Sequence, residues 1–280
     1  MFWWRNCLAE RRYNVMGLNP AFRFLAICLS TVLGAMEADA QGAGGAMEVN
    51  LELVLAVDVS GSMDDEEHAV QRAGYVAAIG HPDFVRAIGA GAHQRIALTY
   101  VEWAGSTLQA TVVPWRIIDG EESARAFADD LAARPITYIR GTSISGALVY
   151  STALFDGNGY DGFRKVIDVS GDGPNRTGIA VDVARDLAVG RGIVINGLPI
   201  MIRPSRSFVS LDRYYADCVI GGPGAFVLPV KKAEEVAEAI RRKLILDIAA
   251  RPGSPIVPVQ ATKPVDCQIG ERIRRQFDDY

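Results

Sequence analysis

The amino-acid sequence predicts an α/β fold: a doubly wound, mostly parallel central sheet with helices on both faces and one antiparallel edge strand. Three observations lead to this prediction. Short aliphatic runs alternate with longer segments of helical character, as in sheets whose parallel strands are joined by helices. Several aliphatic runs are nearly continuous, which indicates strands buried on both faces. Two neighbouring β-rich runs are separated by only a short turn, and this spacing favours a hairpin.

The predicted strands are aliphatic or β-branched runs that stop at polar, glycine or proline residues. They cover residues 51–57, 96–103, 107–115, 166–170, 193–200 and 225–230. The second and third of these runs form the hairpin. Pro114 lies in the hairpin, and because proline cannot donate a main-chain hydrogen bond, it belongs near a sheet edge or at a strand end.

The predicted helices lie between these strands. They cover residues 64–79, 121–133, 145–155, 177–189 and 231–248. Acidic residues occupy the first turn of the first helix, where the helix dipole favours negative charge. The last helix is strongly amphipathic and is therefore expected to pack one face on the core.

The two ends of the chain differ from this folded part. Residues 1–40 are interpreted as a secretory signal peptide, because arginines precede an apolar run and Ala38-Asp39-Ala40 supplies the small residues of a cleavage site. An uncleaved anchor or an isolated apolar helix is the alternative, and translation begins at Met1 or Met16. Residues 41–48 are then a linker, 49–250 the domain and 251–280 a C-terminal tail. We expect a periplasmic or secreted protein with no stable membrane span after cleavage.

Composition narrows the class of partner. The chain has 280 residues and a net charge of -4, which gives no electrostatic basis for binding nucleic acid. Of its four cysteines, only Cys218 and Cys267 remain after the predicted cleavage. In an oxidising compartment these two form a disulfide or stay as unpaired thiols, and we favour the disulfide.

Three polar clusters fall where predicted strands end or predicted helices begin. They contain Asp58, Ser60 and Ser62, then Thr142, then Asp172. Ligands of open α/β sheets bind outside the carboxyl ends of the strands, so we expect these clusters to converge. Carboxylate and hydroxyl oxygens are hard donors that suit Mg²⁺, with Mn²⁺ or Ca²⁺ as alternatives. The sequence therefore predicts a divalent-cation site.

Simpler explanations exist for each of these side chains. The serines and Thr142 are also typical helix caps, and Asp172 is also a typical turn residue. Asp168 competes with Asp172 as the acidic ligand, but it lies inside a predicted strand, where its side chain is expected to point away from the loops. Trp103 and Trp115 are interpreted as packing residues.

The three clusters also resemble known motifs. LAVDVSGSM matches the D-x-S-x-S signature of von Willebrand factor A (VWA) domains, and GTSISGAL and VIDVSGDGPN resemble their second and third loops. The resemblance covers roughly residues 49–250 and implies a metal-ion-dependent adhesion site, or MIDAS, on the five residues named above. VWA domains usually have a threonine where this chain has Gly171. DCVIGGPGAF and the cysteine-bearing tail also resemble a bacterial family of exported VWA proteins without assigned function.

Three functions follow from this site. The first is a protein-binding module whose metal takes a carboxylate from a protein partner, and the second is a domain whose cation only stabilises the fold. The third is a metal-dependent hydrolase, which the sequence does not favour. Ser60 stands where dehalogenase-type phosphatases need a second aspartate, and no G-x-S-x-G motif occurs. The histidines, interpreted as surface or structural residues, are not expected beside the three loops, so we expect no enzyme. They are His68, His81 and His93.

Overall fold

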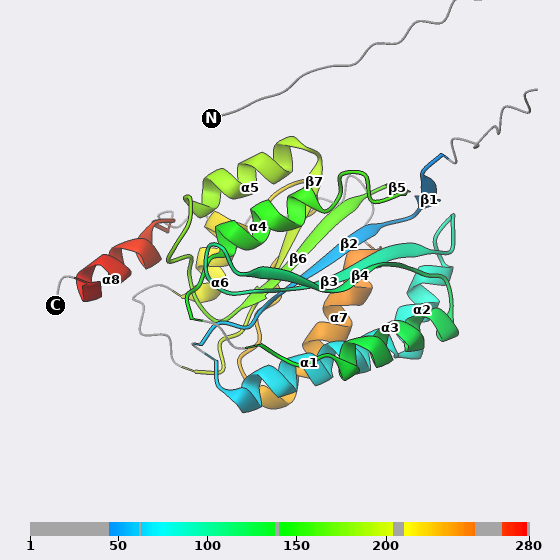
Figure 1. Cartoon of the computed structure of the whole chain (residues 1–280), viewed down its shortest axis with the longest axis horizontal. Helices are drawn as coiled ribbons and strands as arrows, with labels where there is room; N and C mark the ends of the chain where they lie inside the picture. The colour runs from blue at the N-terminus through cyan, green and yellow to red at the C-terminus, as the bar shows by residue number, and fades with distance from the viewer. Residues whose placement is uncertain (1–44, 62, 138–139, 204–209, 250–264, 279–280) are drawn as a thin grey trace, which may run out of the picture. The chain divides into compact units, whose positions relative to one another are not determined.

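The computed structural model describes residues 45–61, 63–137, 140–203, 210–249 and 265–278 (Figure 1). The predicted signal peptide, the first half of the predicted linker, Ser62 and residues 250–264 lie outside the described residues. Within the described chain, no helix has the length and apolarity that a membrane crossing requires.

A central sheet confirms the predicted fold class. Its strands are β2 (Glu52–Asp58), β3 (Ile96–Trp103), β4 (Gln109–Ile118), β6 (Lys165–Gly171) and β7 (Ile193–Pro199). In the described chain they form one five-stranded sheet in the order β4-β3-β2-β6-β7, in which only β4 is antiparallel to its neighbour. β4 lies at the edge, where Pro114 is exposed, as its missing amide hydrogen predicts.

Helices cover both faces of this sheet (Figure 1). One face carries α1 (Asp65–Ile79), α2 (Pro82–Gly89), α3 (Glu121–Ala133) and α7 (Val236–Ala249), and the other carries α4 (Ile144–Ala153) and α5 (Val181–Gly190). Alternation along β2 divides its side chains between two cores: Leu53 and Leu55 contact the first group of helices, and Val54 contacts the second. Every residue of β2 is buried, which explains its continuous hydrophobic run.

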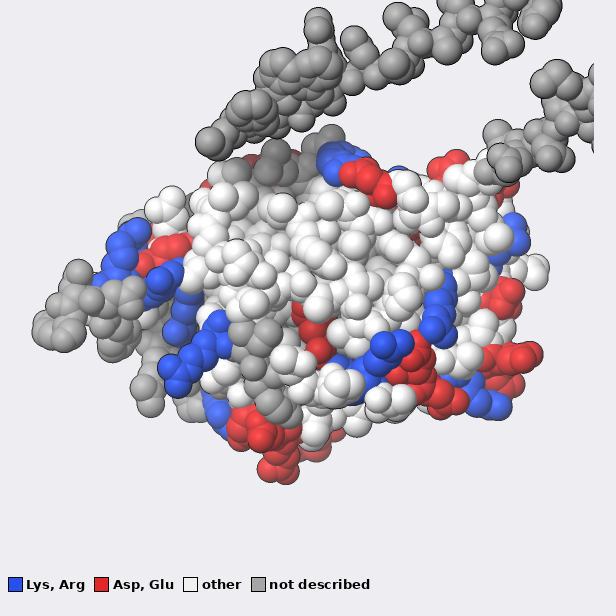
Figure 2. All heavy atoms as spheres, in the orientation of Figure 1, with Lys and Arg blue, Asp and Glu red and all other residues white. Residues whose placement is uncertain are grey.

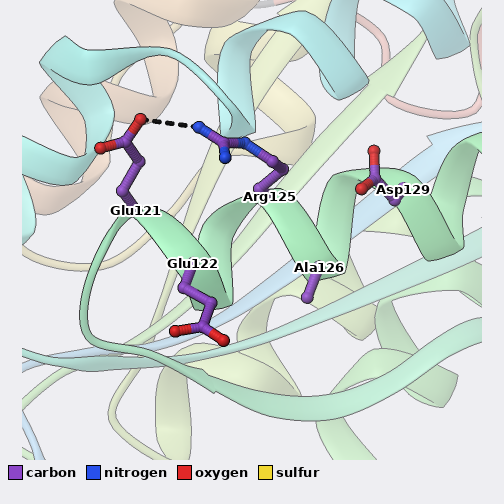
Figure 3. A pocket seen from close by; sticks show the side chains of 5 residues that line it. All are labelled: Glu121, Glu122, Arg125, Ala126 and Asp129. Carbon is purple, nitrogen blue, oxygen red and sulfur yellow. Dashed lines mark hydrogen bonds and ion pairs between the residues drawn. The ribbon is translucent and has the colours of Figure 1, made fainter.

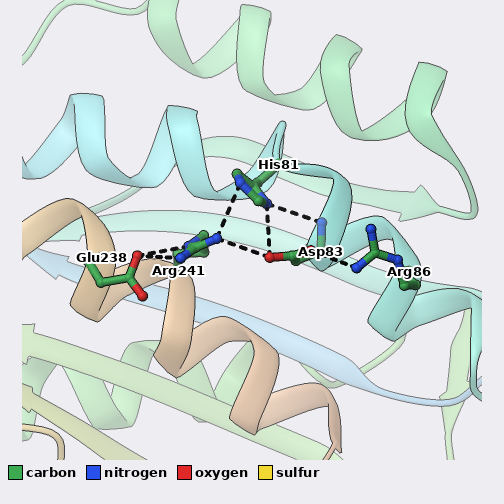
Figure 4. A network of polar contacts seen from close by, with 5 residues as sticks. All are labelled: His81, Asp83, Arg86, Glu238 and Arg241. Atoms are coloured by element: carbon green, nitrogen blue, oxygen red, sulfur yellow. Dashed lines mark hydrogen bonds and ion pairs between the residues drawn. The ribbon is translucent and has the colours of Figure 1, made fainter.

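Polar contacts tie α7 to the start of α2 (Figure 4). The His81 ring caps α2 by accepting a hydrogen bond from the Asp83 amide at 3.1 Å. Arg241 of α7 donates to the Asp83 carboxylate at 3.0 Å and also pairs with Glu238. His81 therefore has a structural role, and α7 is held at its outer surface as well as at its buried face.

Several elements differ from the sequence-based predictions. Residues 225–230 form no regular strand, because only Val227 and Val230 make isolated bridges to the β7 edge. The last predicted helix begins with the 3₁₀ turn η2 (Ala233–Glu235), and α5 begins four residues after the predicted start at residue 177. The pair β1 (Met47–Val49) and β5 (Tyr160–Gly162) draws the end of the predicted linker into the folded unit.

Short helical elements complete the second face, and none of them is predicted from the sequence. α6 (Leu211–Tyr214) continues into η1 (Tyr215–Val219), a single π-helical turn. α8 (Ile269–Asp278) follows near the C-terminus, within the predicted tail. The structure also forms the Cys218–Cys267 disulfide, with the two Cα atoms 5.4 Å apart, which confirms the favoured pairing.

Candidate metal centre

The first polar loop begins where β2 ends. Asp58 is fully buried, and its Oδ1 accepts a hydrogen bond from the Ser60 amide at 2.7 Å. Its main-chain oxygen accepts a second bond from the Gln71 side chain of α1 at 2.9 Å. The chain therefore turns around the Asp58 carboxylate as aspartates commonly allow, and this turn buries Ser60 beside it.

His68 lies against the same loop, which corrects one expectation. This histidine is buried on α1 and its ring lies close to the Ser60 main chain, although no histidine was expected beside the loops. Burial lowers the pKa of His68, so the ring is neutral near pH 7. The ring can therefore pack against the loop without bringing a charge to it.

The Asp58 carboxylate has one oxygen that the described protein does not satisfy. Oδ2 is buried and has no hydrogen-bond partner among the described residues. Burial raises the pKa of Asp58 well above its ordinary value, and the neighbouring Asp172 carboxylate raises it further. Two acidic groups so placed repel each other when ionised, and a divalent cation would remove that repulsion. The donor set present here therefore fits a hard cation.

Gly171 allows the third loop to approach the first. A Cβ atom at this position would lie 2.8 Å from Asp58 Oδ2 and 3.1 Å from Trp103 Cη2. Those distances are shorter than normal contacts, so a side chain at 171 would displace the Asp58 carboxylate. The departure from the usual VWA threonine thus has a local cause: in this chain, Trp103 and the Asp58 carboxylate fill the space.

The second and third loops are joined by main-chain hydrogen bonds. The carbonyl of buried Thr142 accepts from the amides of Arg176 and Thr177, at 3.0 and 3.2 Å. Ser143, not Thr142, is the N-cap of α4, and its Oγ accepts from the Gly146 amide at 3.0 Å. Capping therefore does not explain Thr142, and its loop is fixed to the loop that carries Asp172.

The three loops open into one cavity of about 1020 Å³. Gly61 from the first loop, Thr142 from the second and Thr177 from the third all line it. Of the five predicted ligands, Thr142 lines this cavity, Asp58 lies beside Ser60 and Asp172, and Ser62 lies outside the described residues. Among those residues, no group of three or more His, Cys, Asp or Glu side chains could hold a metal, so the candidate centre depends on hydroxyl donors.

Asp168 does not belong to this centre. Its carboxylate lies 2.7 Å from Lys243 Nζ of α7, on the opposite face of β6 from α4 and α5. Asp247 of the same helix also pairs with Lys243, at 3.4 Å. The side chain therefore points away from the loops, as the strand alternation predicts.

Tyr215 is a buried polar residue at the site that the sequence does not indicate. Its hydroxyl would lie 3.0 Å from a Cβ on Gly171, and it has no hydrogen-bond partner among the described residues. Burial, with the nearby Asp58 and Asp172 carboxylates, raises the pKa of Tyr215 well above its ordinary value. The phenol therefore stays neutral and can donate a hydrogen bond toward the metal centre.

The C-terminal segment also reaches the third loop. The disulfide joins this segment to η1, and the Asn175 side chain donates to Glu271 of α8 at 2.7 Å. Gly270 packs so closely that a Cβ there would lie 2.0 Å from the Asn175 carbonyl oxygen. α8 therefore rests on the loop that carries Asp172.

A second recess lies on α3 and is not connected with this chemistry (Figure 3). All of its lining residues belong to that one helix, and Arg125 pairs with Glu121 of the same helix at 2.7 Å. Since no loop or second element contributes a polar group, we assign no site to it.

Comparisons with known proteins agree with the geometry. The family described as "Protein of unknown function (DUF1194)" matches residues 48–252. A comparison with curated proteins finds no match.

Three solved structures are similar in fold. The proximal thread matrix protein 1 of the mussel byssus is 15% identical with a TM-score of 0.54, and the match covers 72% of this chain and 49% of that one. The pilus adhesin SpaC from Lactobacillus rhamnosus GG is 14% identical with a TM-score of 0.54 (71% and 31% covered). A von Willebrand factor type A protein from Catenulispora acidiphila is 16% identical with a TM-score of 0.51 (72% and 43% covered).

The match spans less than half of each of these relatives. At such identities the similarity shows the fold alone, which is VWA-type. Another structure of the byssus protein is described as having a "zinc occupied MIDAS motif"; it is 12% identical with a TM-score of 0.52 (72% and 49% covered).

Proposed function

We propose that this chain, which belongs to the family described as "Protein of unknown function (DUF1194)", is a metal-dependent protein-binding module of an exported protein. One Mg²⁺ ion, with Mn²⁺ or Ca²⁺ as alternatives, binds a carboxylate of a protein partner. Its proposed ligands are Asp58, Ser60, Ser62, Thr142 and Asp172. One observation carries this proposal: a buried Asp58 oxygen lacks a hydrogen-bond partner among the described residues and lies beside a second acid.

The donor chemistry supports binding rather than catalysis. Mg²⁺ takes about six oxygen ligands and keeps some of its waters, so protein ligands that act partly through water leave a position for an incoming group. A partner carboxylate is a hard, negatively charged oxygen donor and suits that position.

Export rests on two features. The sequence of residues 1–40 has the order of a signal peptide. The Cys218–Cys267 disulfide is typical of the periplasm and of secreted proteins, since thiols are kept reduced in the cytosol. We therefore propose a periplasmic or secreted location.

The second candidate is a cation that only stabilises the fold. The close approach of Asp58 and Asp172 favours it equally, because neutralising two neighbouring acids, one of them buried, stabilises the folded state whether or not a partner binds. The two candidates differ in one measurable property, which is metal-dependent capture of a partner.

The test uses the mature chain without its signal peptide. We expect Mg²⁺ binding by isothermal titration calorimetry in the wild type and its loss in Asp58→Ala, while Asp161→Asn, an exposed acid on β5, binds normally. Immobilised wild type should capture a protein from periplasmic extract in Mg²⁺ but not in EDTA. Metal binding without such capture favours the stabilising cation, and equal capture with EDTA or with Asp58→Ala contradicts the binding module.

A further inference from the structure

We propose that the cavity beside the metal centre binds a second acidic group, so that the partner segment is an acidic peptide with several carboxylates. One carboxylate ligates the metal, and the others pair with Arg140, Arg176 and Arg274. This inference rests on the proposed function and specifies the partner of the same site.

Three arginines from separate segments line this one cavity. Arg140 directly precedes the Thr142 loop, Arg176 belongs to the loop of Asp172, and Arg274 comes from α8. Arg140 and Arg176 are exposed, and within the described chain no carboxylate forms an ion pair with either of them. Figure 2 shows Lys and Arg side chains gathered around α8. The guanidinium groups of Arg140 and Arg176 are therefore available to an incoming anion.

The cavity lining is positively charged although the chain is not. Among the described residues its lining contains three arginines and no acidic side chain, while the whole chain has a net charge of -4. The remaining lining residues are mainly glycine and hydroxyl residues, such as Ser106 and Thr107, which leave room and offer neutral hydrogen bonds. Arginine suits carboxylates in particular, because its planar fork donates two parallel hydrogen bonds.

The size and charge of the site favour a peptide over other anions. Its volume of about 1020 Å³ is at the upper end of the range for pockets that enclose drug-sized ligands, so a single small anion would leave most of it empty. A nucleic acid would bring a dense row of charges against a chain of net charge -4, which disfavours it. A peptide segment with a few acidic side chains matches both the metal and the arginines.

One of the three arginines, Arg274, comes from α8, and a disulfide links the segment just before this helix to η1. The disulfide and the contact of Gly270 with Asn175 hold this helix against the third loop. Both Cys267 and Arg274 lie beyond the part of the chain that the family match covers, which ends at residue 252. The proposed metal ligands thus lie within the family match, whereas one of the three arginines comes from the segment after it.

The experiment uses two biotinylated, C-terminally amidated glycine-serine peptides, one with a single aspartate and one with three. Their binding to the mature chain is measured by biolayer interferometry in excess Mg²⁺ and in EDTA. If each arginine contributes about 0.6 kcal/mol, as exposed ion pairs do, each Arg→Gln change weakens the binding of the three-aspartate peptide about threefold, and the triple variant weakens it roughly 20-fold. The affinity for the one-aspartate peptide should be the same in the arginine variants as in the wild type. The control Arg125→Gln on α3 should leave the affinity for both peptides unchanged.

The outcomes separate this inference from the proposed function. Equal affinity for the two peptides, no binding of either peptide, or unchanged affinity in the triple arginine variant overturns the inference. Stronger binding of a single-stranded oligonucleotide than of the three-aspartate peptide also overturns it. Loss of Mg²⁺ binding by calorimetry is a different result and would overturn the proposed function instead. Circular dichroism of each variant checks that these exposed substitutions leave the fold intact.

Discussion

The stability of this protein should fall as pH rises, because of one buried carboxyl group. Asp168 and Asp247 both contact Lys243, and all three side chains are fully buried between the sheet and α7. One ammonium group balances only one carboxylate. Burial raises the pKa of Asp168 to about 8, with Lys243 lowering it and Asp247 raising it. Asp168 therefore keeps its proton at neutral pH.

The sign and size of the effect follow from proton linkage. Between the ordinary pKa of 3.8 and the folded value of about 8, the folded protein holds a proton that the unfolded chain has lost. The contribution of this proton is fully present below about pH 4 and disappears as pH rises through 8. Each pH unit in that window lowers the free energy of unfolding by about 1.4 kcal/mol. From pH 5 to pH 9 the loss is roughly 4 kcal/mol.

Asp168→Asn tests this reasoning, since asparagine has the same size and stays uncharged. Urea denaturation at a series of pH values gives the difference in free energy of unfolding between variant and wild type, in which the other titrating groups cancel. We expect this difference to change by roughly 4 kcal/mol in favour of the variant between pH 5 and pH 9. Asp161→Asn, exposed on β5, should show no such trend. If Asp168→Asn is destabilising by the same amount at every pH, the charged pair is Asp168–Lys243 and the reasoning is wrong.

Three further perturbations have defined outcomes. Gly171→Ala places a Cβ 2.8 Å from Asp58 Oδ2. It should lower the free energy of unfolding by about 1–3 kcal/mol and weaken Mg²⁺ binding in calorimetry. Unchanged Mg²⁺ affinity would show that the loop moves to make room for the methyl group. Replacing Cys218 and Cys267 by serine opens a loop of sequence separation 49 and should cost ~4 kcal/mol in urea denaturation, and dithiothreitol should then have no further effect on the variant. Mg²⁺ at about 100 times its dissociation constant should stabilise the wild type by about 2.7 kcal/mol in thermal denaturation, whereas Asp58→Ala should show no shift.

The strands and the polar loops were predictable because their signals are local. β2 differs by one residue at each end from the predicted range 51–57, and α3 has the predicted bounds of 121–133. The strand period also assigned Asp168 to the face away from the loops, where Lys243 meets it. Hydrophobic run, period and strand-end position are all properties of neighbouring residues, so one sequence is sufficient to find them.

Elements whose hydrogen bonds go to distant residues were not predictable in the same way. Residues 225–230 have a strand-like composition, but only isolated bridges join them to the edge beside β7. Thr177 has its amide bonded to the Thr142 carbonyl, so the helix predicted from 177 begins only at Val181. Tyr215 lies in a π-helical turn, and only the fold brings its hydroxyl to Gly171.

The same distinction separates the two parts of the proposed binding site. The proposed metal ligands lie in short motifs at the ends of strands or before a helix, which one sequence is sufficient to find. Nothing in the sequence connects Arg140, Arg176 and Arg274, which line one cavity only in the folded chain. Arg274 lies there because the disulfide and the close packing at Gly270 hold α8 against the third loop. A domain can therefore have its metal ligands in a common motif and the residues that determine partner specificity outside that motif. For this chain, we propose that Arg274 of α8 contributes to that specificity.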